Sequence, residues 1–197
     1  QFSFWKWMVN AHGFKDEQVK PYAYNLAQFL QDEKMVQQAY GTAEPIYAAA
    51  AGAKPETFLL ADHGWTTYST TIEARTEMVQ NNPDLIQRFM NASIEGWYNF
   101  LYGDRSAAYG LIMKDNPEMT KEKLDKEMAQ FEKLGIIDVG EALTKGIGAM
   151  DMARVKSFHK LAIDSGIIEA GSVDINKVAT DQFVNKGHGL DIKAKLK

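Results

Sequence analysis

The sequence contains no cysteine, which excludes disulfide bonds, thiolate metal sites and cysteine nucleophiles. It has only five prolines in 197 residues, and no run approaches the roughly 20 apolar residues that a membrane-spanning helix needs. The sequence also lacks Gly-x-Ser-x-Gly, Walker A and Gly-x-Gly-x-x-Gly motifs. The usual sequence signals of α/β-hydrolases and nucleotide-binding proteins are therefore missing.

Charge of neither sign dominates the chain. It has 22 Lys and Arg against 26 Asp and Glu, for a net charge of −4. This balance of charges shows no excess of positive charge of the kind that binds nucleic acid or an anionic membrane. An apolar content of 45% is enough for a buried core. The cluster of Lys193, Lys195 and Lys197 predicts a frayed, solvated C-terminus.

The first third of the sequence alternates between helix and strand patterns. Apolar spacing and terminal glycine or proline predict helices over residues 4–12, 26–36 and 46–51. Short runs rich in β-branched or aromatic residues predict strands over residues 19–24, 36–42 and 57–60. This rhythm is typical of an α/β layer with a parallel sheet.

The remainder of the sequence is mostly helical in pattern. Residues 66–72 predict one more strand, with a linker as the alternative. Asn82 and Pro83 predict a helix start, and Gly103 its end. Further helices are expected over residues 106–113, from Thr120 to Gly135, over 150–163, and from Asp174 onward.

Two segments differ from plain core. The first is the loop from Tyr40 to Pro45, between a predicted strand and a predicted helix. Ligands of open α/β sheets bind outside the carboxyl ends of strands, and helix N-termini offer free N–H groups. Glu44 is therefore a candidate ligand contact, and its alternative role is to cap its own helix.

The second segment runs from Trp65 to Ser69, where aromatic and hydroxyl side chains follow a predicted buried strand. Such side chains suit a small organic ligand, although loop aromatics packed on the core give the same pattern. The four histidines are scattered and form no i, i+4 metal-ligand pair. His63 is interpreted as a turn residue, and His188 as part of a flexible tail.

Several motifs in a fixed order resemble one family. They are Trp7 to Gly13, Val36 to Pro45, Leu60 to Trp65, Tyr68 to Thr71 and Asn82 to Ile86. Together they resemble the NMT1/THI5-like, nitrate/sulfonate/taurine-type family, which comprises substrate-binding proteins of ABC importers. The resemblance covers roughly residues 4 to 165.

The resemblance implies a type II periplasmic-binding-protein-like α/β fold with two lobes. Residues 1–65 would belong to the second lobe, residues 66–74 to a hinge or crossover, and residues 75–197 to a helix-rich return to the first lobe. The abrupt start of the sequence, without an initiator Met or a signal peptide, leads us to expect that the family's N-terminal segment is missing.

The resemblance also implies a binding site. In pyrimidine-binding relatives a glutamate in a comparable loop contacts the ligand, and Glu44 matches it, flanked by Tyr40 and Thr42. Trp65 and Tyr68 would lie near the lobe crossover. A carboxylate beside a tyrosine favours a neutral or cationic aromatic ligand over an oxyanion.

The expected function is that of an extracytoplasmic solute receptor. It would bind a small organic molecule or oxyanion without chemistry, need no cofactor or metal, and deliver its ligand to ABC transporter membrane subunits. The alternative is an enzyme of the thiamin-pyrimidine-synthesis type, a family branch with a cysteine-rich motif that this chain lacks. A third hypothesis is an interaction module without a ligand of its own.

Overall fold

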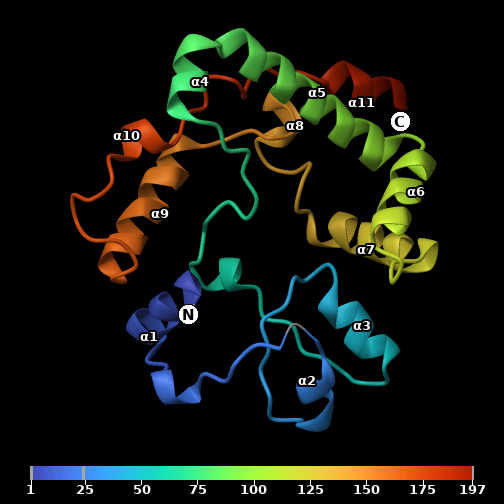
Figure 1. The fold of residues 1–197 in the computed structure, drawn as a ribbon, viewed down its shortest axis with the longest axis vertical. Coiled ribbons are helices and arrows are strands. Elements are labelled where there is room, and N and C mark those ends of the chain that lie inside the picture. Colours follow the sequence, from blue (N-terminus) through green and yellow to red (C-terminus); the bar gives the residue numbers. More distant parts are fainter. Residues whose placement is uncertain (1, 24, 197) are drawn as a thin grey trace. The chain divides into compact units, whose positions relative to one another are not determined.

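A computed structural model describes residues 2–23 and 25–196 of the chain (Figure 1). The elements in chain order, with η for 3₁₀-helices, are α1 (Ser3–His12), η1 (Asp16–Gln18), α2 (Ala27–Gln31), α3 (Glu44–Ala50), η2 (Leu60–His63), α4 (Thr76–Asn81), α5 (Pro83–Tyr102), α6 (Ser106–Asp115), α7 (Lys121–Leu134), α8 (Ala142–Lys145), α9 (Met152–Asp164), α10 (Ile175–Val178) and α11 (Leu190–Leu196). None of these helices within the described ranges has the length and apolarity of a membrane span.

The predicted α/β, type II periplasmic-binding-protein-like fold is wrong for this structure, because no described residue lies in a β-strand. A strand exists only through hydrogen bonds to a neighbouring strand, and a suitable side-chain pattern does not supply that neighbour. Val36 is 86% exposed and Phe58 is 69% exposed, although both lie in segments predicted to be strands. Tyr24, at the end of the first predicted strand, lies outside the described residues.

The chain forms two compact units, each assembled from two separate stretches. The first unit comprises Gln1–Thr70 and Asp151–Thr180, and the second comprises Thr71–Met150 and Asp181–Lys197. The backbone therefore passes from one unit to the other after residues 70, 150 and 180. Neither unit is a continuous piece of sequence.

The second unit is built around α5. As predicted, this helix begins with Pro83 and is followed by Gly103, although the Asn82 side chain makes no capping hydrogen bond. Tyr98 is fully buried, and its hydroxyl accepts a hydrogen bond from the Ile147 N–H at 3.1 Å. Buried side chains of α5, α6 and α7 surround it.

The C-terminal helix α11 packs against α5 in the second unit. Lys193 Nζ lies 2.6 Å from Asp138 Oδ2, and its side chain is only 16% exposed. The expectation of a frayed, solvated C-terminus is therefore wrong for Lys193. Gly189 precedes α11 with a positive φ of 81°, and a Cβ placed there would lie 2.4 Å from the Tyr98 ring. Only glycine lets the backbone approach Tyr98 this closely.

The first unit joins the N-terminal helix α1 to α9. Trp7 is buried and packs on Trp65, with 5.4 Å between ring centroids. Asn10 Nδ2 donates to the Ser165 carbonyl at 3.0 Å, and Lys6 Nζ donates to the Gly166 carbonyl at 3.1 Å. These two α1 side chains satisfy carbonyl groups at the C-terminal end of α9, which have no partner within the helix.

Candidate functional site

Tyr40, Thr42 and Glu44 lie in one tight turn that leads into α3. Glu44 is the first residue of α3, and its Oε2 accepts a hydrogen bond from the Tyr40 N–H at 2.7 Å. The Ala43 N–H donates to the Tyr40 carbonyl at 3.0 Å. The Glu44 carboxylate thus fastens the turn before the helix. The Tyr40 side chain projects from this turn and is 66% exposed.

Trp65 belongs to an aromatic cluster of the first unit. Besides Trp7, it contacts Phe158 of α9 edge-on, with 4.9 Å between ring centroids. Trp7 also contacts the His12 ring at 4.7 Å. These contacts are those of a packing residue, which was the alternative reading of this segment. A ligand contact by Trp65 stays a prediction.

Tyr68 and Arg154 join the segment after η2 to the N-terminal turn of α9. The Tyr68 hydroxyl accepts the Asp151 N–H at 2.8 Å, and the Arg154 guanidinium carbon lies 4.3 Å from the Tyr68 ring centroid. Arg154 also donates to the carbonyl groups of Thr66 at 2.6 Å and Thr67 at 3.0 Å. Tyr68 therefore uses both its ring and its hydroxyl within the protein, and its contact with a ligand stays a prediction.

A first hollow, of about 300 Å³, lies between α1 and the end of α9 and is lined by Lys6, Val9, Asn10, Asp16, Ser165 and Gly166. Asp16 Oδ1 accepts a hydrogen bond from Trp5 Nε1 at 2.8 Å. An ammonium group and a carboxylate thus border the same space. This arrangement suits a small polar molecule with both a donor and an acceptor.

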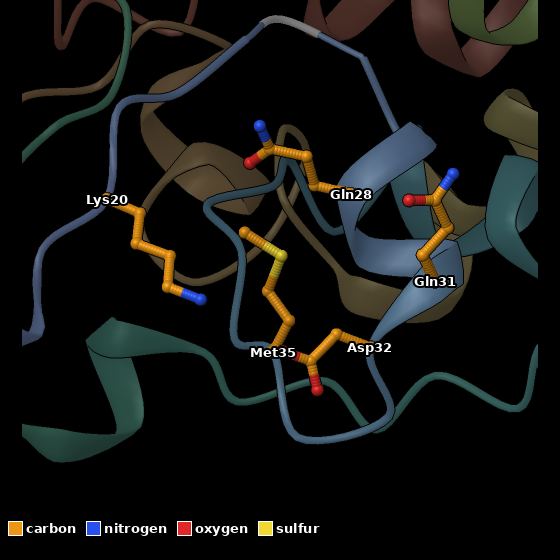
Figure 2. Close-up of a pocket in the computed structure, with 5 residues that line it drawn as sticks. All are labelled: Lys20, Gln28, Gln31, Asp32 and Met35. Carbon is orange, nitrogen blue, oxygen red and sulfur yellow. The ribbon is translucent and has the colours of Figure 1, made fainter.

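A second hollow, of about 390 Å³, surrounds the end of α2 and is lined by Lys20, Gln28, Gln31, Asp32 and Met35. In Figure 2, Lys20 comes from the segment before α2 and lies across the space from Asp32 and Met35. The hollow is wide and its rim is exposed, since Met35 alone of these residues is half-buried. It could hold a small polar molecule only loosely.

The histidines occupy separate places. The His188 ring Nε2 lies 2.8 Å from Glu95 Oε1, so the expectation of a flexible tail there is wrong. His63 is the exposed last residue of η2, consistent with a turn residue. Within residues 2–23 and 25–196, no three His, Cys, Asp or Glu side chains are grouped closely enough to hold a metal ion.

The predicted site residues form two groups. The structure brings Tyr40, Thr42 and Glu44 together in one turn, and it places Trp65 and Tyr68 on the segment that packs against α9. Sequence reasoning missed Arg154 and Lys6, because a lysine or arginine within a helix normally indicates only a solvated face. Their partners lie far away in sequence, so no local signal could have found them.

Comparison with known proteins gives one match. The chain matches the family model described as NMT1/THI5 like over residues 3–108, a range that holds Tyr40, Thr42, Glu44, Trp65 and Tyr68. No curated protein and no solved structure is significantly similar to it. Because the matched range covers more than half of the sequence, the chain belongs to the NMT1/THI5-like family.

Proposed function

We propose that this chain is a solute-binding protein of an ABC importer, which binds a small molecule and releases it unchanged. The observation that carries the proposal is the family match over residues 3–108, since the family includes substrate-binding proteins of such importers. The protein would work outside the cytoplasm and deliver its ligand to the importer's membrane subunits. The two hollows of the first unit, about 300 and 390 Å³, are of a size for small molecules and are lined by residues other than the five predicted ligand contacts.

The turn from Tyr40 to Glu44 is the proposed ligand contact. Its backbone is fixed by the bond between Glu44 Oε2 and the Tyr40 N–H, so the exposed Tyr40 ring is held on an ordered support. A ring beside a carboxylate favours a neutral or cationic aromatic molecule such as a pyrimidine. The turn itself contains no lysine or arginine to attract an oxyanion.

A ligand screen tests the proposal directly. The purified chain is heated with pyrimidines, taurine, alkylsulfonates, nitrate and aromatic carboxylates, and compounds that raise its melting temperature are measured by calorimetry. A ligand present at 100 times its dissociation constant should stabilise the fold by about 2.7 kcal/mol. We expect a pyrimidine to bind and to be recovered unchanged. No binding across the whole panel would contradict the proposal.

Two further measurements on the same sample distinguish a solute-binding protein from the alternative, an enzyme of the thiamin-pyrimidine-synthesis type. A pyrimidine-forming enzyme would consume or modify its bound partner, which mass spectrometry of the recovered ligand detects. Stoichiometric iron in the purified protein would also overturn the receptor proposal. Unmodified ligand released from protein without stoichiometric iron supports a receptor.

A further inference from the structure

Helix α5 carries an apolar face that the described residues of this chain leave largely exposed. One side of the helix presents the buried residues Ile94, Tyr98 and Leu101. Another side presents what we call the outer face, which consists of Leu85, Phe89, Ala92, Ser93, Gly96 and Trp97. Its large members are strongly exposed, at 45% for Leu85, 58% for Phe89 and 42% for Trp97. A helix that is apolar on two sides is normally covered on both.

Gly96, in the middle of the outer face, has no close neighbour among the described residues that would explain a glycine there. Glycine inside a helix costs about 1 kcal/mol relative to alanine, so it is usually explained by a close neighbour. Within the described part of the chain, a Cβ placed on Gly96 would meet no atom within 4 Å, and the φ of Gly96 is not in the positive range. The missing side chain therefore leaves open space above the helix, which another helix could enter.

The outer face is narrow in the middle and bulky toward its ends. Ala92 and Gly96 are small, and the Ser93 hydroxyl donates to the Phe89 carbonyl at 2.9 Å. The Ser93 hydroxyl therefore keeps a hydrogen-bond acceptor even when another helix covers the outer face. Phe89 before these small residues and Trp97 after them provide the large apolar side chains of the outer face.

We propose that the outer face of α5 binds the same face of a second copy of this chain, with the two helices antiparallel. Pairing about the midpoint between Ala92 and Ser93 places Phe89 of each copy opposite Gly96 of the other. Each bulky ring then faces the open space left by a glycine. A twofold interface requires such self-complementarity, since the same patch supplies both sides.

The charges at the edge of the outer face are also self-complementary. Arg88 and Glu95 lie along the same edge of α5, about two helical turns apart. In the antiparallel arrangement each Arg88 lies beside Glu95 of the other copy, so opposite charges meet twice and like charges stay apart. Glu95 is held in place by the His188 ring, 2.8 Å away.

The size of the outer face determines how strongly the two copies are expected to bind. A helix of 20 residues is about 30 Å long, and one side of it offers less than the roughly 800 Å² per partner of a standard stable interface. The dimer is therefore weak and depends on concentration. It is independent of the ligand binding proposed above.

The first test is sedimentation velocity of the full chain over a range of concentrations. We expect the wild type to shift from monomer toward dimer as its concentration rises. Gly96→Leu should stay monomeric, because the leucine side chain would fill the space that Phe89 of the other copy occupies in the dimer. Gly110→Leu is the matched control, since Gly110 lies in α6 and a Cβ there also meets no atom within 4 Å. It should dimerise like the wild type. Circular dichroism verifies that both variants are folded.

The second test uses the absence of cysteine from the chain. Ser93→Cys places one thiol near the proposed twofold axis, so mild oxidation should give a disulfide-linked dimer. Ala129→Cys, at an exposed position of α7, should give little disulfide-linked dimer. A wild type that is monomeric up to its solubility limit would overturn the proposal. Association that Gly96→Leu leaves unchanged, or equal cross-linking of both cysteine variants, would also overturn it.

Discussion

Lys193 Nζ lies 2.6 Å from Asp138 Oδ2, and the two side chains are only 16% and 4% exposed. The Tyr102 hydroxyl donates a hydrogen bond to the same carboxylate oxygen. Among the described residues, Asp138 Oδ1 is buried without a hydrogen-bond partner. Lys193 is therefore the cation that compensates the buried Asp138 carboxylate, because an isolated charge that is shielded from water is strongly unfavourable. This ion pair holds α11 on the second unit.

Removing the cation should destabilise the protein strongly. Lys193→Met leaves the Asp138 carboxylate buried without its positive partner, and we expect a loss of about 3–5 kcal/mol in the free energy of unfolding. Lys195→Met is the control on the same helix, because its pair with Asp191 is exposed, at 74% and 71%. It should change stability by less than about 1 kcal/mol. Urea denaturation measures both, and equal losses would contradict the role of Lys193.

The protein should lose stability at high pH because of two tyrosines. Burial raises the pKa of Tyr98 above its ordinary value of 10.0. Burial and the hydrogen bond to Asp138 raise the pKa of Tyr102 as well. Above pH 10 the unfolded chain therefore releases these protons while the folded chain retains them, which favours unfolding. The stabilisation is complete below pH 10 and is lost as the pH rises toward the folded pKa values.

Denaturation curves at increasing pH check this expectation, with near-ultraviolet absorbance to follow tyrosine ionisation. Tyr102→Phe should weaken the dependence on pH because it removes one of the two shifted groups. A stability that stays constant through this range would show that both hydroxyl groups ionise equally in the folded and unfolded chains.

The sequence predicted those parts of the fold that depend on neighbouring residues. Pro83 marks the start of α5, and the Thr120 side chain accepts the Lys123 N–H at 3.2 Å to cap α7. Gly135 ends α7 with a φ of 59°. Each signal acts within one helical turn, so it can be read without the rest of the structure.

The sequence could not predict what depends on distant partners. The segment containing Val36 has the composition of a strand, but a strand requires another segment to pair with. Lys193 resembles a solvated terminal lysine until Asp138 is placed beside it. In the candidate site, the turn from Tyr40 to Glu44 was predicted as a unit, whereas the bond from Glu44 to the Tyr40 N–H and the position of Arg154 follow only from the structure.

Gly189 should be far less tolerant of substitution than Gly110. In Gly189→Ala the new Cβ would lie 2.4 Å from the Tyr98 ring, at a φ of 81°, so we expect a loss of about 2–4 kcal/mol from overpacking and backbone strain. Gly110→Ala lies in a helix with open space around it and should gain about 0.5–1 kcal/mol. Thermal unfolding compares the two variants. A tolerated alanine at position 189 would refute the close packing of α11 on Tyr98.

Arg154 and Tyr68 should be energetically coupled. Arg154→Lys loses the paired donation to Thr66 and Thr67 and the flat contact with the Tyr68 ring, and should cost about 1–2 kcal/mol. Tyr68→Phe removes only the acceptor for the Asp151 N–H and should cost about 0.5–1.5 kcal/mol. Tyr68→Ala removes the ring as well, so Arg154→Lys should cost less in that background. Additive losses in a double-mutant cycle of Arg154→Lys with Tyr68→Ala would mean that the ring contact contributes nothing.

Glu44 is tested by a substitution that keeps its shape. Glu44→Gln retains an oxygen that can accept the Tyr40 N–H, so the free energy of unfolding should change by less than about 1 kcal/mol. If the carboxylate contacts the ligand, affinity should fall about tenfold or more. Glu56→Gln, at an exposed position of the same unit, makes the same change of charge as a control. Calorimetry with a ligand from the screen compares the variants, and unchanged affinity would remove Glu44 from the site.

The order of the units along the chain has a consequence for synthesis on the ribosome. The first unit lacks Asp151–Thr180 until those residues are synthesised, and the second lacks Asp181–Lys197 until still later. Asp138 thus leaves the ribosome well before Lys193, the residue that neutralises it. A nascent chain stalled before Lys193 would hold the helices from α1 to α10 but lack the Lys193 ammonium. The core of the second unit should therefore close around Asp138 only after α11 has been synthesised.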